Sequence, residues 1–285
     1  MQPFRAAIVA VLTLLFALQV YAANDVQARW GLTSSQYQSE FDKFVKNGYR
    51  LNYVSGYANE TSKQALYAGI WEKRASSAWQ ARHGVTLSQY LTIFEQLRSQ
   101  GYHPTLLHGY PVNGETRFAT IWEKSPVDAW EQRVDMSAAG LQGHLDRLTP
   151  RGYRLTHLSG YDVNGEARYA ATWEKRESVE WFVRVGQTAI ERGNEAGHLS
   201  ALGYKVAHVS GYYVNAEEYF SVIWEKGTIK GQGAYWLDAH RLFPDAFEEK
   251  YDLYNGLYGW APKVINGYSA GECAIKYSAL WEKQF

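Results

Sequence analysis

The segment Phe118-Ala119-Thr120-Ile121-Trp122-Glu123-Lys124 recurs in closely similar form along the chain. Self-similarity at a fixed period is typical of proteins built from tandem structural units. The triplet Trp-Glu-Lys recurs at intervals of 51, 51, 51 and 57 residues, beginning at Trp71, Trp122, Trp173, Trp224 and Trp281. The sequence therefore predicts a single repeat domain of five units, at approximately 24–73, 74–124, 125–175, 176–226 and 227–285.

Other landmarks keep the same register. A glycine followed by an aromatic residue stands at Gly48, Gly101, Gly152, Gly203 and Gly259, and a Gly-Tyr pair follows eight residues later, at Gly56, Gly109, Gly160, Gly211 and Gly267. An arginine lies 19 residues before the first glycine in four units, at Arg29, Arg82, Arg133 and Arg184. A tryptophan precedes three of these arginines by three positions, and the fifth unit has His240 in place of the arginine.

Each unit has the pattern of an amphipathic helix followed by a hairpin. In the second unit, Ser88 is a candidate N-cap for a helix over 87–97, in which Tyr90, Phe94 and Leu97 recur at helical spacing. The first glycine of each unit can adopt the left-handed conformation that ends helices. A strand then leads to the second Gly-Tyr, and Asn-Gly at Asn113 and Asn164 indicates a tight hairpin turn before the strand that carries the triplet.

These elements predict an α+β fold of five tandem helix-plus-β-hairpin repeats of about 51 residues. Both faces of the triplet strand are mostly apolar, so we expect helices on one side and packed side chains on the other. Two strands in each of five units give about ten strands. Because unpaired sheet edges are hazardous, we expect a ring or barrel-like closure with the helices outside.

The composition limits the partners and the location. A charged start and an apolar run from Ala6 to Val20 predict a signal peptide at 1–22, with a domain at 23–285 that is secreted or periplasmic. Charges balance at 29 basic and 29 acidic residues, so we expect no nucleic-acid partner. The only cysteine, Cys273, excludes an intramolecular disulfide and a lipid-bearing cysteine at the cleavage site, and we expect no membrane anchor.

The Trp-x-x-Arg, Gly-Tyr-Arg and Trp-Glu-Lys landmarks at this spacing resemble the bacterial tandem repeat family found beside serine hydrolases of the β-lactamase type, including polyglycine hydrolases. The likeness spans roughly residues 26 to 283. It implies an accessory domain. Enzymes of the β-lactamase type have a serine three residues before a lysine, and no lysine here has one. The resemblance therefore implies the accessory part without the enzyme, and no catalytic residue is assigned.

Recurrent charged and aromatic residues suggest structural roles. The triplet glutamate shares a strand face with small and aliphatic residues, so it needs a partner, and we expect Arg82, Arg133 and Arg184 each to pair with one such glutamate. A catalytic carboxylate is normally unique, whereas this one appears five times. The same recurrence favours a packing role for the tryptophans over sugar-binding platforms.

Candidate chemical groups are few. His157 with Ser159 and His208 with Ser210 face the same way on their strands, and a Ser-His pair near Asp162 would suit nucleophilic catalysis. Asp162, Asn164 and Glu166 faintly resemble a calcium loop, but a hairpin turn explains them better. We expect no metal and no cofactor, because paired cysteines, a His-Glu-x-x-His arrangement and a phosphate-binding loop are absent from the sequence.

Two functions remain open at this point. The first is a binding module whose repeated surface recognises a protein, a peptide or a cell-wall glycan. Its candidate binding residues are Tyr57, Tyr110, Tyr161, Tyr212 and Tyr268, with His108, His157 and His208. For the tyrosines, packing at a strand end is an equally strong interpretation. The second function is a small serine hydrolase that uses Ser159 or Ser210 with its histidine.

Overall fold

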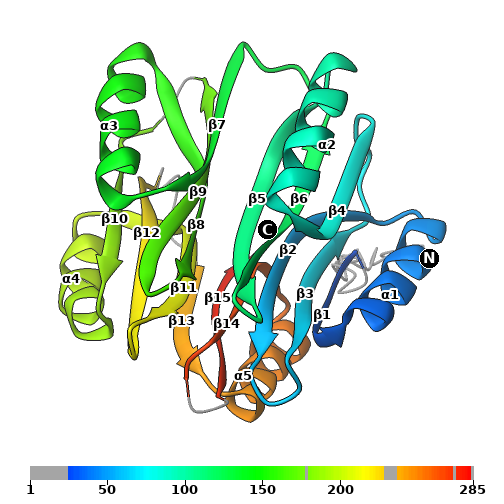
Figure 1. The fold of residues 1–285 in the computed structure, drawn as a ribbon. Helices are drawn as coiled ribbons and strands as arrows, with labels where there is room; N and C mark the ends of the chain where they lie inside the picture. Colours follow the sequence, from blue (N-terminus) through cyan, green and yellow to red (C-terminus); the bar gives the residue numbers. More distant parts are fainter. Residues whose placement is uncertain (1–24, 177–178, 228–235, 272–273, 284–285) are drawn as a thin grey trace, which may run out of the picture.

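The computed structural model describes residues 25–176, 179–227, 236–271 and 274–283 (Figure 1). The predicted signal peptide and Cys273 lie outside these residues. The first unit consists of strand β1 (Val26–Thr33), helix α1 (Ser34–Lys46), strand β2 (Arg50–Asn59) and strand β3 (Gln64–Glu72). The other units repeat this order, so the five helix-and-hairpin repeats are confirmed.

The bounds of the remaining elements follow the same period. The second unit has β4 (Trp79–Thr86), α2 (Leu87–Ser99), β5 (His103–Val112) and β6 (Glu115–Glu123). The third has β7 (Ala129–Met136), α3 (Ala138–Leu148), β8 (Tyr153–Val163) and β9 (Glu166–Lys175). The fourth has β10 (Trp181–Gln187), α4 (Ala189–Ala201), β11 (Tyr204–Val214) and β12 (Glu217–Lys226). The fifth has β13 (Trp236–Leu242), α5 (Pro244–Tyr251), β14 (Trp260–Ser269) and β15 (Ile275–Lys283).

The sequence analysis missed the strand that opens each unit. Each unit forms a three-stranded antiparallel sheet in which the triplet strand is central, as in the order β1-β3-β2. The opening strand pairs with the triplet strand but shifts register between Arg29 and Leu32. Gly31 at this bulge has a φ of 67°. The bulge interrupts the alternation by which a strand is recognised in a sequence.

The helices begin and end largely as the sequence predicts. Helix α2 covers the predicted segment, but its N-cap is Thr86 rather than Ser88. The Thr86 side chain accepts from the Gln89 amide while the Gln89 side chain accepts from the Thr86 amide, so a capping box fixes the helix start. Gly101 follows the helix with a φ of 81°, and the Asn113-Gly114 turn has a positive φ at both residues.

The tryptophan of the triplet forms the core of each unit. All five of these indoles are at most 1% exposed. In four units the indole contacts an aromatic ring of the unit's own helix, and Trp224 contacts Trp236 of the fifth unit. In the first unit, the ring centroids of Phe44 and Trp71 lie 5.0 Å apart, and those of Tyr37 and Trp71 lie 5.8 Å apart. The predicted packing role of these tryptophans is confirmed.

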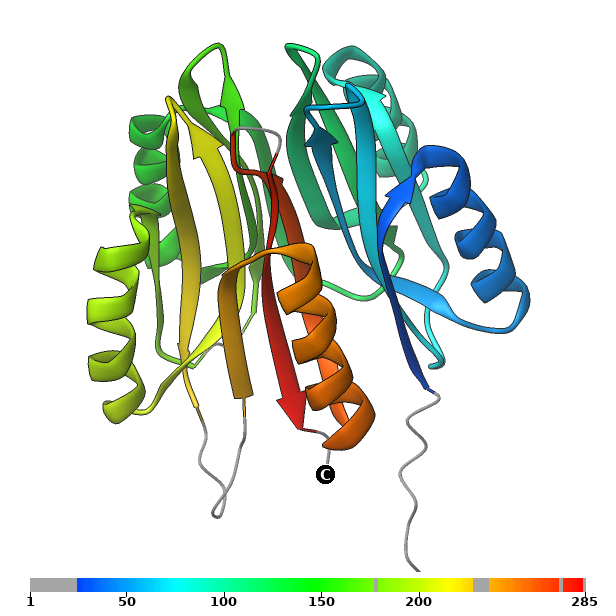
Figure 2. The same cartoon turned by 90° about the horizontal axis from the view of Figure 1, so that it is seen from below.

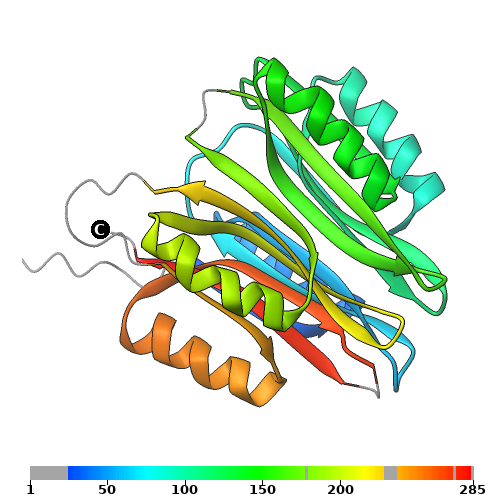
Figure 3. The same ribbon diagram turned by 90° about the vertical axis from the view of Figure 1, so that its left-hand side faces the viewer.

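The five sheets stay separate, so the sheet does not close into a barrel. Instead, the strand that follows the helix in each unit faces a common axis, and the helices lie on the outer side (Figures 2 and 3). These axial strands are β2, β5, β8, β11 and β14, and each contacts the next. Strand β14 of the fifth unit also contacts β2 of the first. No helix in the described part of the chain is long and apolar enough to cross a membrane.

Candidate functional site

The second Gly-Tyr of each unit joins neighbouring units around the axis. The tyrosine ring of one unit lies on the glycine of the unit before it, so a Cβ atom added to Gly109 would lie 2.5 Å from Cε1 of Tyr161. Tyr110, Tyr212 and Tyr268 cover the glycines of their preceding units in the same way. Tyr57 of the first unit covers Gly267 of the fifth. Only glycine allows this close approach.

Side-chain hydrogen bonds follow the same path around the axis. The residue before each glycine reaches the glycine of the preceding unit. The Gly109 amide donates to Oγ of Ser159, and the Gly160 amide donates to Oγ of Ser210, both at 3.1 Å. The Gly267 amide likewise donates to Oγ of Ser55, and the Gly211 amide donates to Oδ1 of Asn266. In the remaining pair, the His108 imidazole donates a hydrogen bond to the backbone of Gly56. These bonds replace the strand pairing that the separate sheets lack.

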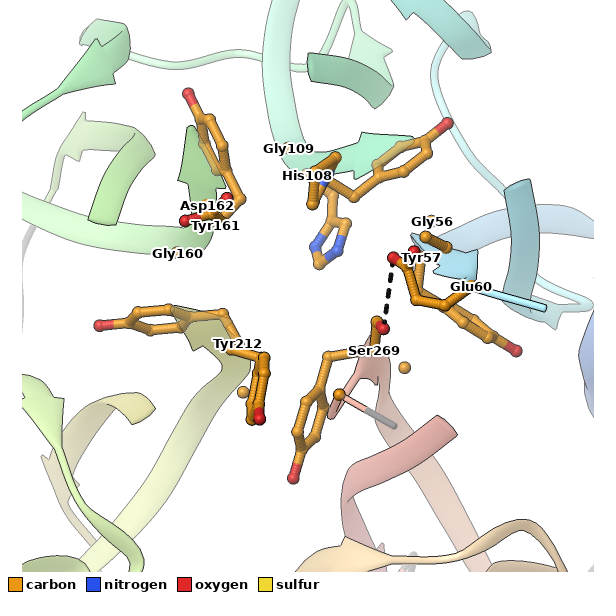
Figure 4. A pocket seen from close by; sticks show the side chains of 18 of the residues that line it. Gly56, Tyr57, Glu60, His108, Gly109, Gly160, Tyr161, Asp162, Tyr212 and Ser269 are labelled. Atoms are coloured by element: carbon orange, nitrogen blue, oxygen red, sulfur yellow. Dashed lines mark hydrogen bonds between the residues drawn. The ribbon is translucent and has the colours of Figure 1, made fainter. Parts of the chain in front are cut away.

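The Gly-Tyr pairs surround a cavity of ≈730 Å³ at one end of the axis. Figure 4 shows the tyrosines arranged around its centre and the imidazole of His108 pointing into it. We call this cavity the axial pocket. Its lining also includes Glu60, Lys63, Asp162 and Ser269. This volume is in the range of about 300 to 1,000 Å³ that is typical of ligand pockets.

The tyrosines have a packing role in the walls of this pocket. All five are between 1% and 4% exposed. Figure 4 shows the hydroxyl groups of Tyr57, Tyr161 and Tyr212 pointing away from the centre of the pocket. The Tyr57 hydroxyl accepts from the Gly31 amide at 2.9 Å and lies 2.8 Å from the Tyr277 hydroxyl. The Tyr110 hydroxyl donates to the Tyr67 hydroxyl at 2.9 Å. A ligand would therefore meet ring faces and backbone, and a binding role for these tyrosines stays a prediction.

The three predicted histidines do not share one site. His108 lines the axial pocket. His157 and His208 line a second cavity of ≈310 Å³, which lies nearer the first residues of the axial strands. All three are at most 5% exposed. The ring centroids of His157 and His208 lie 4.4 Å apart, and Nε2 of His208 lies 2.9 Å from the Leu158 carbonyl oxygen. Neither ring nitrogen of His157 has a hydrogen-bond partner among the described residues.

Burial keeps these histidines neutral. It lowers the pKa of His108 to about 3, with a further lowering by the charge of His208. Burial lowers the pKa of His208 to about 4, although its bond to Leu158 opposes the shift. The pKa of His157 is also well below its usual value because of burial and the two neighbouring histidines. A protonated imidazole here would be a buried charge without a carboxylate partner.

The serines do not pair with the histidine of their own strand. Ser159 instead lies 3.4 Å from Nδ1 of His108, a residue of the neighbouring unit. The Ser159 hydroxyl is fully buried and donates to the Gly109 carbonyl at 3.2 Å. A serine held in this way is poorly placed to attack a substrate, and a histidine with so low a pKa is a weak base.

The prediction that Arg82, Arg133 and Arg184 pair with triplet glutamates is wrong. Arg82 donates to the Ala81 carbonyl and the Gln80 side chain, and Arg133 and Arg184 pair with Glu131 and Glu195. The actual partner is the basic residue after the first Gly-Tyr, and it belongs to the preceding unit. The observed pairs are Arg50 with Glu123, Arg154 with Glu225 and Lys205 with Glu282.

Two of the five triplet glutamates are exceptions. The second unit has His103 at the basic position, and Glu174 of the third unit pairs with Arg176 at 3.3 Å. The fifth unit has Ala261 where the other units have a basic residue, so it offers no cation to Glu72 of the first unit. Glu72 instead pairs with Arg74 at 3.2 Å and accepts from the Asn52 side chain. Glu72 therefore has the partners that the sequence predicts it to need, and Asn52 and Arg74 supply them.

The rim of the axial pocket was not predicted from the sequence. Its residues directly follow the Gly-Tyr pairs and differ from unit to unit, namely Ala58, Pro111, Asp162, Tyr213 and Ser269. Asp162 accepts from the Gly165 amide at 3.0 Å within the hairpin turn, and burial raises its pKa. Variation at one position of an otherwise regular repeat is the signal that could have identified this rim. In the described part of the chain, no group of three or more His, Cys, Asp or Glu residues could hold a metal ion.

The repeat matches a known family model five times in succession. The model describes the structural repeat of polyglycine hydrolase-like proteins, and the matched segments are residues 23–74, 76–125, 127–176, 178–227 and 239–284. These matches cover most of the chain and agree with the resemblance drawn from the landmark residues.

Proposed function

The chain belongs to the polyglycine hydrolase-like structural repeat family, and we propose that it is a secreted or periplasmic, non-catalytic binding module for a protein, a peptide or a cell-wall glycan. The observation that carries this proposal is the axial pocket, to which every unit contributes one Gly-Tyr pair. A site assembled from all units can exist only in the complete arrangement.

The contrast between walls and rim supports binding. The walls are nearly the same in each unit because the glycine and the tyrosine hold the units together. The rim carries an alanine, a proline, an aspartate, a tyrosine and a serine at one repeat position. A regular scaffold with a varied rim presents an asymmetric surface, and such a surface can select one ligand orientation.

The alternative is a small serine hydrolase, which the contact between Ser159 and His108 would favour. The burial of Ser159, its hydrogen bond to the Gly109 carbonyl and the low pKa of His108 weaken that alternative. Neither residue has a carboxylate partner among the described hydrogen bonds. The binding function is therefore the better supported of the two.

Purified protein should be applied to glycan and peptide arrays, and the best ligand should be titrated by calorimetry. Asp162→Asn on the rim should weaken binding by about tenfold or more, because a hydrogen bond to a charged group is worth about 1.5–3 kcal/mol. Tyr213→Ala should weaken binding as well, because it removes an aromatic surface from the rim. Ile190→Ala is the matched control, because Ile190 is 75% exposed on α4 and does not line the pocket.

Three results would count against the proposal. Binding that is equal in the rim variants and the wild type would place the ligand elsewhere. The absence of any array ligand would contradict a binding role. Ester or polyglycine hydrolysis that is lost in Ser159→Ala would support the hydrolase instead.

A further inference from the structure

A groove on the outer surface lies between the first and second units, away from the axial pocket. It has a volume of ≈590 Å³ and is lined by residues of α1 and β4. Phe41 and Trp79 form its aromatic wall, with ring centroids 5.8 Å apart in an edge-to-face arrangement. Both rings are only partly buried. Gln38, Gln80 and Arg82 add polar groups to the lining.

The arginine of this groove differs from its counterparts in the other units. Arg29 pairs with Glu40 at 3.4 Å, and Arg184 pairs with Glu195 at 2.7 Å. In both units the carboxylate comes from the helix, 11 residues after the arginine. In the third unit, Arg133 pairs with Glu131 of its own strand at 2.6 Å.

The second unit has a neutral residue at both of these carboxylate positions. Ile93 lies 11 residues after Arg82, and Gln80 occupies the place of Glu131. Arg82 consequently has no carboxylate within ion-pair distance among the described residues. Its guanidinium donates to the Ala81 carbonyl at 2.7 Å and to Oε1 of Gln80 at 2.8 Å. The guanidinium has five N–H donors, so several remain available for a ligand.

We propose that this groove binds a carboxylate-bearing sugar, with Arg82 holding the carboxylate. A guanidinium matches the two oxygens of a carboxylate with two parallel hydrogen bonds. Gln38 donates to Asp42 and Gln80 accepts from Arg82, and the remaining N–H and lone-pair positions of both amides can bond hydroxyl groups. The Trp79 ring adds apolar surface beside them, with the Arg50 guanidinium 5.7 Å from its centroid on one face. An acidic sugar combines these features in one ring, whereas a simple anion lacks the apolar face and the hydroxyl groups.

Two variants test whether binding needs an Arg82 side chain that has no carboxylate partner within the protein. Arg82→Gln removes the cation. Ile93→Glu leaves Arg82 in place but supplies the carboxylate that the first and fourth units have. Both variants should bind glucuronic acid about tenfold or more weaker than the wild type, because each one removes the charge-assisted hydrogen bonds between Arg82 and the carboxylate. Arg184→Gln, which removes an arginine that is already paired, should leave this binding unchanged.

The probes are glucuronic acid, glucose, acetate and a short peptide with a free carboxyl terminus. Calorimetry would measure affinity, and the indole N–H signal of Trp79 in nuclear magnetic resonance spectra would locate the binding. We expect glucuronic acid to bind most tightly and to shift the Trp79 signal. The assignment would be overturned if the peptide bound more tightly than glucuronic acid, or if glucose bound equally well. It would also be overturned if Arg82→Gln kept the affinity of the wild type, or if glucuronic acid did not bind at millimolar concentration. The axial-pocket variant Asp162→Asn should have no effect, so the two sites fail or succeed separately.

Discussion

The hydroxyl group of Ser55 donates to the carbonyl oxygen of Ile265 at 2.7 Å, although the two residues are 210 positions apart. The same hydroxyl accepts from the Gly267 amide at 3.3 Å. These two bonds connect the axial strand of the first unit to that of the fifth. The two sheets are not joined by strand pairing, so the buried Ser55 side chain makes these bonds, beside the contact of Tyr57 with Gly267.

Replacing Ser55→Ala should lower the free energy of unfolding by about 1–3 kcal/mol, because the amide of Gly267 and the carbonyl of Ile265 would then be buried without a partner. Urea denaturation followed by circular dichroism measures this loss. Ser62→Ala, at an exposed position in a hairpin turn, should change stability by less than about 0.5 kcal/mol. Equal stability of the two variants would contradict the role given to Ser55.

The ion pairs between units give a second prediction. The Arg50 side chain is 3% exposed and its partner Glu123 is 14% exposed. Arg50→Ala should therefore lower the free energy of unfolding by about 3–5 kcal/mol, since it leaves a largely buried carboxylate unpaired. Arg82→Ala removes an exposed arginine and should lower it by less than about 1 kcal/mol. Chemical denaturation of both variants measures the difference, and similar losses would show that the pair between units is unimportant.

The buried histidines predict a stability that falls in mild acid. In the unfolded chain these side chains take up protons near pH 6.5, whereas in the folded protein His108 and His208 do so only near pH 3 and pH 4. The unfolded state therefore binds more protons below pH 6.5, and stability decreases as the pH falls from 6.5 towards 4. Each such histidine should lower the free energy of unfolding by about 2–3 kcal/mol between pH 6.5 and 4.5. Denaturation at several pH values measures this slope.

His157 provides the variant for this pH test. Its imidazole has no hydrogen-bond partner among the described residues, so His157→Leu should not reduce stability at pH 7. The variant should show a shallower loss of stability between pH 6.5 and 4.5, because one group that protonates only on unfolding is gone. The exposed His198 is the control, and His198→Gln should keep the slope of the wild type. An unchanged slope in His157→Leu would contradict the prediction.

Glycine substitutions test the contact between units directly. Gly109→Ala would place a methyl group against the ring of Tyr161, and should lower the free energy of unfolding by about 1–3 kcal/mol through overpacking. Gly143 lies in the exposed middle of α3, with no atom within 4 Å of an added Cβ. Gly143→Ala should raise stability by about 0.5–1 kcal/mol. Thermal unfolding of the pair measures both effects, and a stable Gly109→Ala protein would show that the tyrosine can move aside.

The parts of the fold that follow from local patterns could be predicted. The period of the triplet indicated five units, and the glycines at positive φ and the Asn-Gly turns marked the end of each helix and the tip of the hairpin. The tryptophans were expected in the core because they recur. Each of these features depends on neighbours within one unit, which the sequence displays directly.

Other features depend on how units meet, and the sequence alone did not reveal them. The glutamate of the triplet was assigned to an arginine in the Trp-x-x-Arg motif, but the cation that reaches it follows the Gly-Tyr of the preceding unit, as Arg50 reaches Glu123. The opening strand was missed because its bulge breaks the alternation. The tyrosines were named as candidate binding residues, with packing as the alternative, but the direction of their hydroxyl groups depends on the bulge amide of the opening strand, as Gly31 shows for Tyr57.

The cover of Gly267 by Tyr57 has a consequence for the order of the chain. Since the fifth unit meets the first through the same contact that joins every other pair, no unit is special as a starting point. A circularly permuted chain, opened in the connection between β3 and β4 and joined through a linker between its present ends, should keep the same set of neighbours. A chain with one unit deleted or duplicated should not, because closing the circle would then require a different rotation between every pair of neighbours. The number of copies is therefore a property of the shape rather than of chain length, unlike in open repeat arrays, which can gain or lose copies at an end.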